Sequence, residues 1–297
     1  MRALRSARPT AGLFSTLYKH DGLIGKTKRS LSVALAIALL SGFNDRASAE
    51  STMPISIAIV IDDLGHHYER GKALVDMPYP LTLSFLPGRK YTLALSKRAY
   101  LAGKEVMLHA PMENTRQFPL GFGGLTSDMD KVAVQRSLQT SIVGVPHLVG
   151  LNNHMGSALT QNPKAMSWVM ELVSSYPLYF LDSKTSASSV AASTAKRYGI
   201  PTMVRDVFLD HEQTPDYVEK QFEKLLDIAQ RKGQAIAIAH PHKVTIDFLQ
   251  EVLPSLGERG ITIATASGLW QMKHPHRAMF PSQQRPRESN LAFSGEF

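Results

Sequence analysis

"IAIVIDDLGHH", residues 57–67, is an apolar run that ends in two neighbouring aspartates. Its first five residues are typical of a strand buried on both faces. Asp62 and Asp63 each raise the cost of ionising the other. Neighbouring residues of a regular strand point to opposite faces, so both can reach one site only if the strand breaks there, for which Gly65 offers a position. A bound cation would relieve the repulsion, and a turn or helix N-cap is the alternative interpretation.

Short β-rich segments alternate with helical patterns along residues 55–266, which predicts an α/β fold with parallel strands. The expected strands are 55–61, 81–85, 105–108, 149–151, 178–181, 202–204, 235–239 and 261–264. The expected helices are 91–102, 130–142 after a cap at Ser127 or Asp128, 163–174, 188–198, 215–232 after a Thr214 cap, and 244–256. Seven or eight such strands predict a barrel or a barrel-like sheet.

Polar residues of the kinds that bind ligands follow most of these strands. They are Asp62 and Asp63, His109, Asn152, Asn153 and His154, Asp182, Asp206, and His240. The carboxyl ends of parallel strands share one face of an α/β fold, and that face carries the site. We therefore expect these side chains to converge.

Four clusters contain the chemistry, and each has a plainer interpretation. His109 and Glu113 in "LHAPMEN" are normal zinc ligands, and Pro111 indicates a loop; the alternative is a hydrogen-bonded core histidine. The block of Asn152, Asn153 and His154 is too polar for a barrel strand, and a turn held by asparagine side chains is its alternative. His240 in "IAIAHPH" follows an apolar strand and could protonate a leaving group. Together with the aspartate pair, these are the parts of metal-assisted hydrolysis.

The ends of the chain carry the charge. The formal net charge is +8, of which residues 1–49 hold +6 and residues 273–297 hold +2, so residues 50–272 are neutral overall. This distribution argues against a nucleic-acid footprint. The absence of cysteine excludes disulfides and cysteine nucleophiles.

Residues 1–49 have the pattern of an export signal, with basic residues, an apolar run and Ala47-Ser48-Ala49 before a cleavage site. We expect a protein exported to a bacterial periplasm; an uncleaved membrane anchor is the alternative. Residues 50–272 are the expected catalytic domain. Residues 273–297 are polar and aperiodic, which predicts a disordered tail.

The words "IAIVIDDLG", "GKEVMLHAPME", "GLNNHMGS", "FLDSKTSASSV", "RDVFLD" and "AIAIAHPH" occur in this order. Over residues 53–268 the chain thereby resembles the divergent polysaccharide deacetylases, a branch of the polysaccharide deacetylase superfamily. The resemblance implies a distorted (β/α) barrel of seven or so parallel strands and a divalent metal, with zinc expected. It also implies removal of N-acetyl groups from an envelope polysaccharide or glycan.

The resemblance further implies roles for single residues. Asp62 corresponds to the catalytic base and Asp63 to a metal ligand. His109 matches the first histidine of a His-(Ser/Thr)-x-x-His motif whose fifth position is Glu113 here, so the third ligand is His154 or, as the alternative, Glu113. His240 corresponds to the acid.

Further residues are candidates for orienting the metal ligands or for contacting the substrate. Asp182, Arg205 and Asp206 are candidates for orienting the ligands or the sugar, with ion pairs at the barrel rim as the alternative, and Asn152 and Asn153 are possible contacts. Since the second histidine of the motif and an Arg-x-Pro motif are missing, a non-catalytic glycan-binding or regulatory protein is the competing hypothesis.

Overall fold

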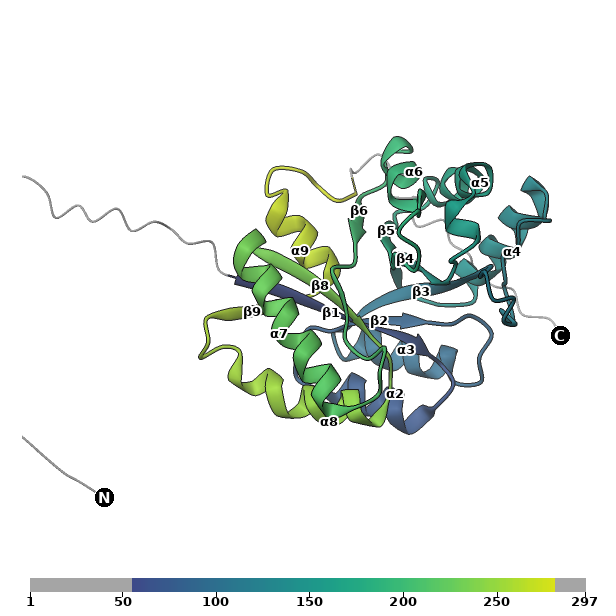
Figure 1. Cartoon of the computed structure of the whole chain (residues 1–297). Helices are drawn as coiled ribbons and strands as arrows, with labels where there is room; N and C mark the ends of the chain where they lie inside the picture. Colours follow the sequence, from purple (N-terminus) through teal and green to yellow (C-terminus); the bar gives the residue numbers. More distant parts are fainter. Residues whose placement is uncertain (1–54, 281–297) are drawn as a thin grey trace, which may run out of the picture. The chain divides into compact units, whose positions relative to one another are not determined.

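The computed structural model of the chain describes residues 55–280, which form a curved parallel sheet surrounded by helices (Figure 1). The strands are β1 (Ile55–Leu64), β2 (Thr82–Phe85), β3 (Glu105–Met112), β4 (Leu148–Met155), β5 (Tyr179–Asp182), β6 (Thr202–Val204), β7 (Val207–Phe208), β8 (Gln234–Ala239) and β9 (Ile261–Ala264). They lie in the order β6-β5-β4-β3-β2-β1-β8-β7, and β9 also pairs with β1. This arrangement confirms the predicted distorted barrel of parallel strands.

Strand β1 is the centre of the sheet. One edge pairs with β8 along residues 56–61, and the other edge pairs first with β9 and then with β2. Ile57, Ile59 and Ile61 pack under the helices, whereas Ala58 and Val60 face the interior of the curved sheet. Burial on both faces explains why the sequence of β1 is continuously apolar rather than alternating.

Two rows of helices cover the outside of the sheet. They are α2 (Tyr68–Asp76), α3 (Thr92–Leu101), α4 (Lys131–Val143), α5 (Pro163–Val173), α6 (Ala191–Arg197), α7 (Pro215–Lys232) and α8 (Lys243–Val252), with 3₁₀ turns at Leu159–Gln161 and Leu253–Ser255. One row runs α3, α2, α8, α7, and the other runs α4, α5, α6 (Figure 1). The amphipathic pattern predicted for α7 is confirmed, and the Thr214 side chain caps its first turn.

Helix α9 (Ala266–Lys273) packs from the opposite side, on the interior of the sheet. The buried carboxyl group of Glu105 on β3 fixes its start: it accepts hydrogen bonds from Thr82 Oγ1 and Tyr179 Oη, at 2.9 and 2.8 Å, and from the backbone and hydroxyl of Ser267. One carboxyl group thus joins three strands and a helix at the amino-terminal end of the sheet.

The differences from the sequence-based elements have local causes. The short helices α2 and α9 and the two-residue strand β7 were not predicted. Gly71 weakens the helical pattern in the sequence of α2. The position suits glycine because a side chain there would clash with Leu95. The expected caps of α4 at Ser127 or Asp128 are wrong, since the Asp130 carboxylate accepts the hydrogen bond from Ala133.

The two chain ends are only partly described. The predicted signal segment lies outside the described residues, as do residues 281–297 of the predicted tail. Residues 273–280 are described: His274 stacks on Trp270, and Met279 and Phe280 pack against the interior core. None of the helices within residues 55–280 has the length and apolarity of a membrane span.

We expect Tyr179→Phe to lower the free energy of unfolding by about 1.5–3 kcal/mol, because it removes a buried hydrogen bond to a carboxyl group. Tyr176→Phe is the control, since the Tyr176 hydroxyl takes no part in this network, and should change stability by less than about 0.5 kcal/mol. Urea denaturation measures both. Equal effects of the two substitutions would contradict the structural role of Glu105.

Candidate active site

The backbone of β1 changes course at Asp63, which has a φ of 58°. The pairing with β2 also shifts register between Ile61 and Leu64. The predicted break in the strand therefore exists, but it is at Asp63 itself. It lets both aspartates approach one imidazole: His109 Nε2 lies 3.6 Å from Asp62 Oδ2 and 3.1 Å from Asp63 Oδ1.

Three potential donor atoms converge at this point. Asp63 Oδ1 lies 2.8 Å from His154 Nδ1 and 3.1 Å from His109 Nε2, and the two nitrogens are 3.1 Å apart. Asp63 Oδ1 is buried; both imidazole nitrogens are within ion-pair distance of it, but among residues 55–280 no group makes a hydrogen bond of good geometry with it. Tetrahedral zinc with bonds of 2.0–2.1 Å separates its ligands by about 3.3 Å. The triangle therefore has the donor set, and nearly the spacing, of three zinc ligands.

Electrostatics favour a cation in the triangle. Burial opposes the ionisation of Asp63, but the neighbouring His109 and His154 outweigh it and hold the pKa of this carboxyl well below its usual range. Asp63 is thus an anion that faces two imidazole nitrogens.

The Asn152 side chain determines which ring nitrogen of neutral His109 carries the proton. Its side-chain oxygen accepts from Ser84 Oγ at 2.7 Å and lies 2.8 Å from His109 Nδ1, while its amide nitrogen donates to Asp62 Oδ1 at 2.8 Å. The donation to a carboxylate fixes the orientation of the amide, so its oxygen faces the histidine. In neutral His109, Nδ1 then carries the proton and Nε2 presents a lone pair to the triangle, as a metal ligand requires.

Asp62 is the second carboxylate and is almost completely buried, with an exposed fraction of 1%. Burial raises its pKa above the ordinary value, and the charges of His109 and His240 and the Asn152 hydrogen bond offset only part of this effect. Asp62 lies outside the triangle but beside His109. A carboxylate that is adjacent to a metal site and has a raised pKa has the properties of a general base.

His240 directly follows β8 and is held by Asp210. One carboxylate oxygen lies 2.8 Å from His240 Nδ1, and the other accepts from the His240 backbone at 2.6 Å and from Thr245 Oγ1 at 2.8 Å. Burial lowers the pKa of His240, but Asp210, with smaller contributions from Asp63 and Asp62, outweighs it and raises the pKa to about 9. His240 is therefore protonated at neutral pH; its Nδ1 contacts Asp210, and its Nε2 has no hydrogen-bond partner among residues 55–280.

Asp210, His240 and His242 form a second group with donor atoms within 4.8 Å of one another. Asp210 already accepts the three hydrogen bonds described above. The triangle around Asp63, whose oxygen has no hydrogen-bond partner in the described part of the chain, is the better candidate for a metal.

Arg205 lies on the His240 side of the candidate site. It donates to the backbone oxygens of Ser183 and Lys184 at 2.7 and 3.0 Å, and its guanidinium lies 3.6 Å from the centre of the Phe208 ring. The Phe208 ring in turn stacks on His240. Arg205 thus ties the loop after β5 to the side of His240.

Other candidate residues lie apart from the triangle. Glu113 accepts a hydrogen bond from the Ser127 backbone at 2.8 Å, so the geometry brings His154, and not Glu113, to Asp63 and His109. Asp182 binds the backbone of Lys184 and the hydroxyl of Ser189, and Asn153 binds the backbones of Met155 and Ser183. Asp206 pairs with Lys232, at 2.8 Å.

Two sequence interpretations of this region are wrong. Residues 152–154 lie within β4, although this block looked too polar for a strand, and residues 109–112 lie within β3, although Pro111 indicated a loop. Buried Asn152 and Asn153 are tolerated in a strand because their amides are hydrogen-bonded to neighbouring elements. Asp210 was not identified from the sequence, where its only signal is its place directly after "VFL" in "RDVFLD".

We expect His154→Ala to weaken zinc binding by at least about 100-fold, a larger effect than loss of a residue that only orients a ligand. Glu113→Ala is the matched control and should change affinity by less than about twofold, because its carboxylate contacts a loop backbone. Competition with a chelating dye measures both constants. Unchanged affinity in His154→Ala would rule this residue out as the third ligand.

Comparison with known proteins places the chain in a family. The sequence profile of the divergent polysaccharide deacetylases matches residues 59–270. Uncharacterized protein YibQ of Escherichia coli (strain K12) is 36% identical over 239 residues, which are 80% of this chain and 75% of YibQ. An uncharacterized protein of Haemophilus influenzae is 35% identical over 215 residues, 72% of this chain and 76% of that protein.

The crystal structure of an uncharacterized protein from Agrobacterium tumefaciens C58 is similar with a TM-score of 0.69 and 28% identity, over 72% of this chain and 88% of that one. The profile match covers most of the chain and includes Asp62, Asp63, His109 and His154 on their strands and His240 directly after β8. This chain belongs to the divergent polysaccharide deacetylase family.

Proposed function

We propose that this protein is a metal-dependent hydrolase that removes N-acetyl groups from an envelope polysaccharide or glycan. The observation that supports the proposal is that Asp62 lies 3.6 Å from His109 of the triangle, while His240 follows Ala239, the partner of Ile61 in the sheet, and so comes to the same end of β1 as Asp62. A protein that only binds a glycan has no need of a buried base and a separately held acid beside a metal site.

The triangle fits a divalent metal, and zinc is the expected ion because two imidazoles and one carboxylate leave a fourth position open. Asp63, His109 and His154 would hold it. When bound, such an ion polarises the amide carbonyl and makes water a stronger nucleophile. Asn152 supports this arrangement through its contact with His109 Nδ1.

The chain's own groups perform the proton transfers. Asp62, ionised and close to the triangle, takes the proton of the attacking water. His240, protonated through its contact with Asp210, gives a proton to the nitrogen of the departing amine. Because Asn152 donates to Asp62 and Asp210 holds His240, each group has a fixed orientation before substrate binds.

The sequence supports a place for this activity. The pattern of residues 1–49 is that of an export signal, and a periplasmic location would bring the enzyme to N-acetylated polymers of the envelope. The location and the polymer are part of the proposal.

Asp62→Asn should reduce acetate release from N-acetylated glycan oligomers by about 10²–10⁴-fold, since the amide cannot accept the proton. Its oxygen can still accept the hydrogen bond from Asn152, so zinc affinity should stay within about threefold of wild type. Acetate release and metal content are measured on the same preparations. Zinc-loaded wild type that releases no acetate from any envelope glycan would support the non-catalytic alternative.

Asp210→Asn should move the alkaline limb of the pH–rate profile to lower pH. In the wild type the acid form of His240 persists up to about pH 9, so activity falls as pH rises through that value. The substitution removes the charge that raises the pKa while burial still lowers it. Acetate release measured from pH 5 to 10 gives both limbs, and an unmoved alkaline limb would exclude His240 as the acid.

A further inference from the structure

A cavity with a volume of about 480 Å³ lies between strands β6 and β8. It is lined by the first residues of β8, from Gln234 to Ile236, and by residues 196–206 around β6. His240 follows the opposite, carboxyl end of β8. The cavity is therefore separate from the candidate active site, and the proposed deacetylation does not use it.

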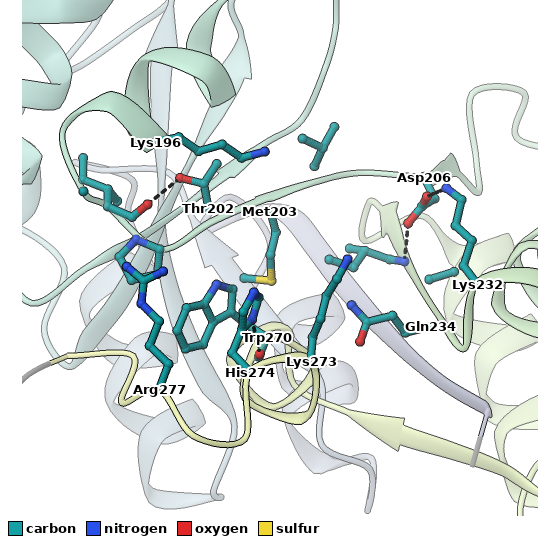
Figure 2. A pocket seen from close by; sticks show the side chains of 16 residues that line it. Lys196, Thr202, Met203, Asp206, Lys232, Gln234, Trp270, Lys273, His274 and Arg277 are labelled. Atoms are coloured by element: carbon teal, nitrogen blue, oxygen red, sulfur yellow. Dashed lines mark hydrogen bonds and ion pairs between the residues drawn. The ribbon is translucent and has the colours of Figure 1, made fainter. Parts of the chain in front are cut away.

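The cavity exists because the barrel is not closed here. In the described sheet β6 pairs only with β5, and β8 is reached from this side only by β7. Asp206 makes the last link: its backbone donates to the Ile236 oxygen and its carboxylate accepts from the Ile236 nitrogen. Nearer the amino ends the strands separate, and α9 with the residues after it forms one wall (Figure 2).

Positive charge gathers around this cavity. Lys196, Lys232, Lys273 and Arg277 line it together with a single carboxylate, Asp206, and Figure 2 shows them along its two sides. Lys232 pairs with Asp206 at 2.8 Å. Within residues 55–280, no carboxylate lies in ion-pair distance of the other three cations. Residues 50–272 are neutral overall, so the cavity joins two lysines of this neutral part, Lys196 and Lys232, with Lys273 and Arg277 from the positively charged segment that follows.

The uncharged residues that line the cavity suit an organic ligand. Trp270 and Met203 supply apolar surface. The Thr202 hydroxyl donates to the Ile200 oxygen and so keeps acceptor capacity towards the cavity, and the Gln234 amide adds both donors and an acceptor. His274 is held by its stacking on Trp270 and by the contact of its Nδ1 with the Trp270 oxygen. A volume of this size is typical of small-molecule sites.

We propose that this cavity is a second binding site, for a small oligoanion that carries at least two phosphate or carboxylate groups. Lys196 stands on one side and Lys273 and Arg277 on the other, so two linked anionic groups can contact both sides at once (Figure 2). Arginine favours these groups because its fork binds two oxygens. A ligand with one anionic group can neutralise only part of the cluster.

The test uses the full chain with Trp168→Phe, which leaves Trp270 as the only tryptophan of the two in the sequence. Its fluorescence is titrated with pyrophosphate, with citrate and with inorganic phosphate at low ionic strength. We expect a saturable change with pyrophosphate or citrate and a dissociation constant at least about tenfold weaker for inorganic phosphate. Binding should weaken as salt is added.

Lys196→Gln and Lys273→Gln, each in the same background, should weaken binding by about tenfold. Lys97→Gln is the matched control, an exposed lysine on α3 that should have less than about a twofold effect. A response to pyrophosphate assigns a phosphate ligand, and a response to citrate alone assigns a carboxylate ligand. No saturable response, or equal weakening in Lys97→Gln, would overturn the proposal without affecting the proposed deacetylation.

Discussion

The candidate site depends on the left-handed backbone of Asp63. On a regular strand Asp62 and Asp63 would point to opposite faces, and only one of them could reach His109. A φ of 58° at a residue other than glycine costs about 1–2 kcal/mol, so the surrounding structure must hold it. The conformation gives the two carboxylates different environments. Asp63 faces two imidazoles, while Asp62 remains buried beside them with a raised pKa.

Asn152 couples this local geometry to the sheet. Its side chain contacts Asp62 on β1, Ser84 on β2, His109 on β3 and Ser183 after β5. Four neighbouring parts of the fold thereby determine which nitrogen of His109 faces the triangle. The same strands bury a continuous apolar core on both faces, so Asp62, Asp63, His109 and His154 stand on rigid strands, while His240 and Asp210 directly follow such strands.

The sequence predicts the strands well because buried parallel strands have a continuous apolar pattern. It also predicts that polar residues at the carboxyl ends of parallel strands converge at one edge of the sheet. Asp63, His109 and His154 do meet beside Asp62, whereas Asp182 and Asp206 bind other partners. The separate roles expected for Asp62, His154 and His240 come from the resemblance to the family. Pattern alone does not show that β3 and β4 continue through their polar residues, because that depends on partners from distant elements. The sequence pattern does not identify Asp210 for the same reason. Its role depends on contacts with His240 and Thr245, which lie 30 and 35 residues away in the sequence.

The central claim is that Asp63, His109 and His154 bind one metal ion while His240 does not. Zinc X-ray absorption spectroscopy of the zinc-loaded full chain tests it directly. We predict two imidazole nitrogens and oxygen ligands at about 2.0–2.1 Å, and the same spectrum for His240→Ala. A third imidazole that disappears in His240→Ala would show that His240 is a ligand rather than the acid, and the absence of imidazole scattering would contradict the metal site itself.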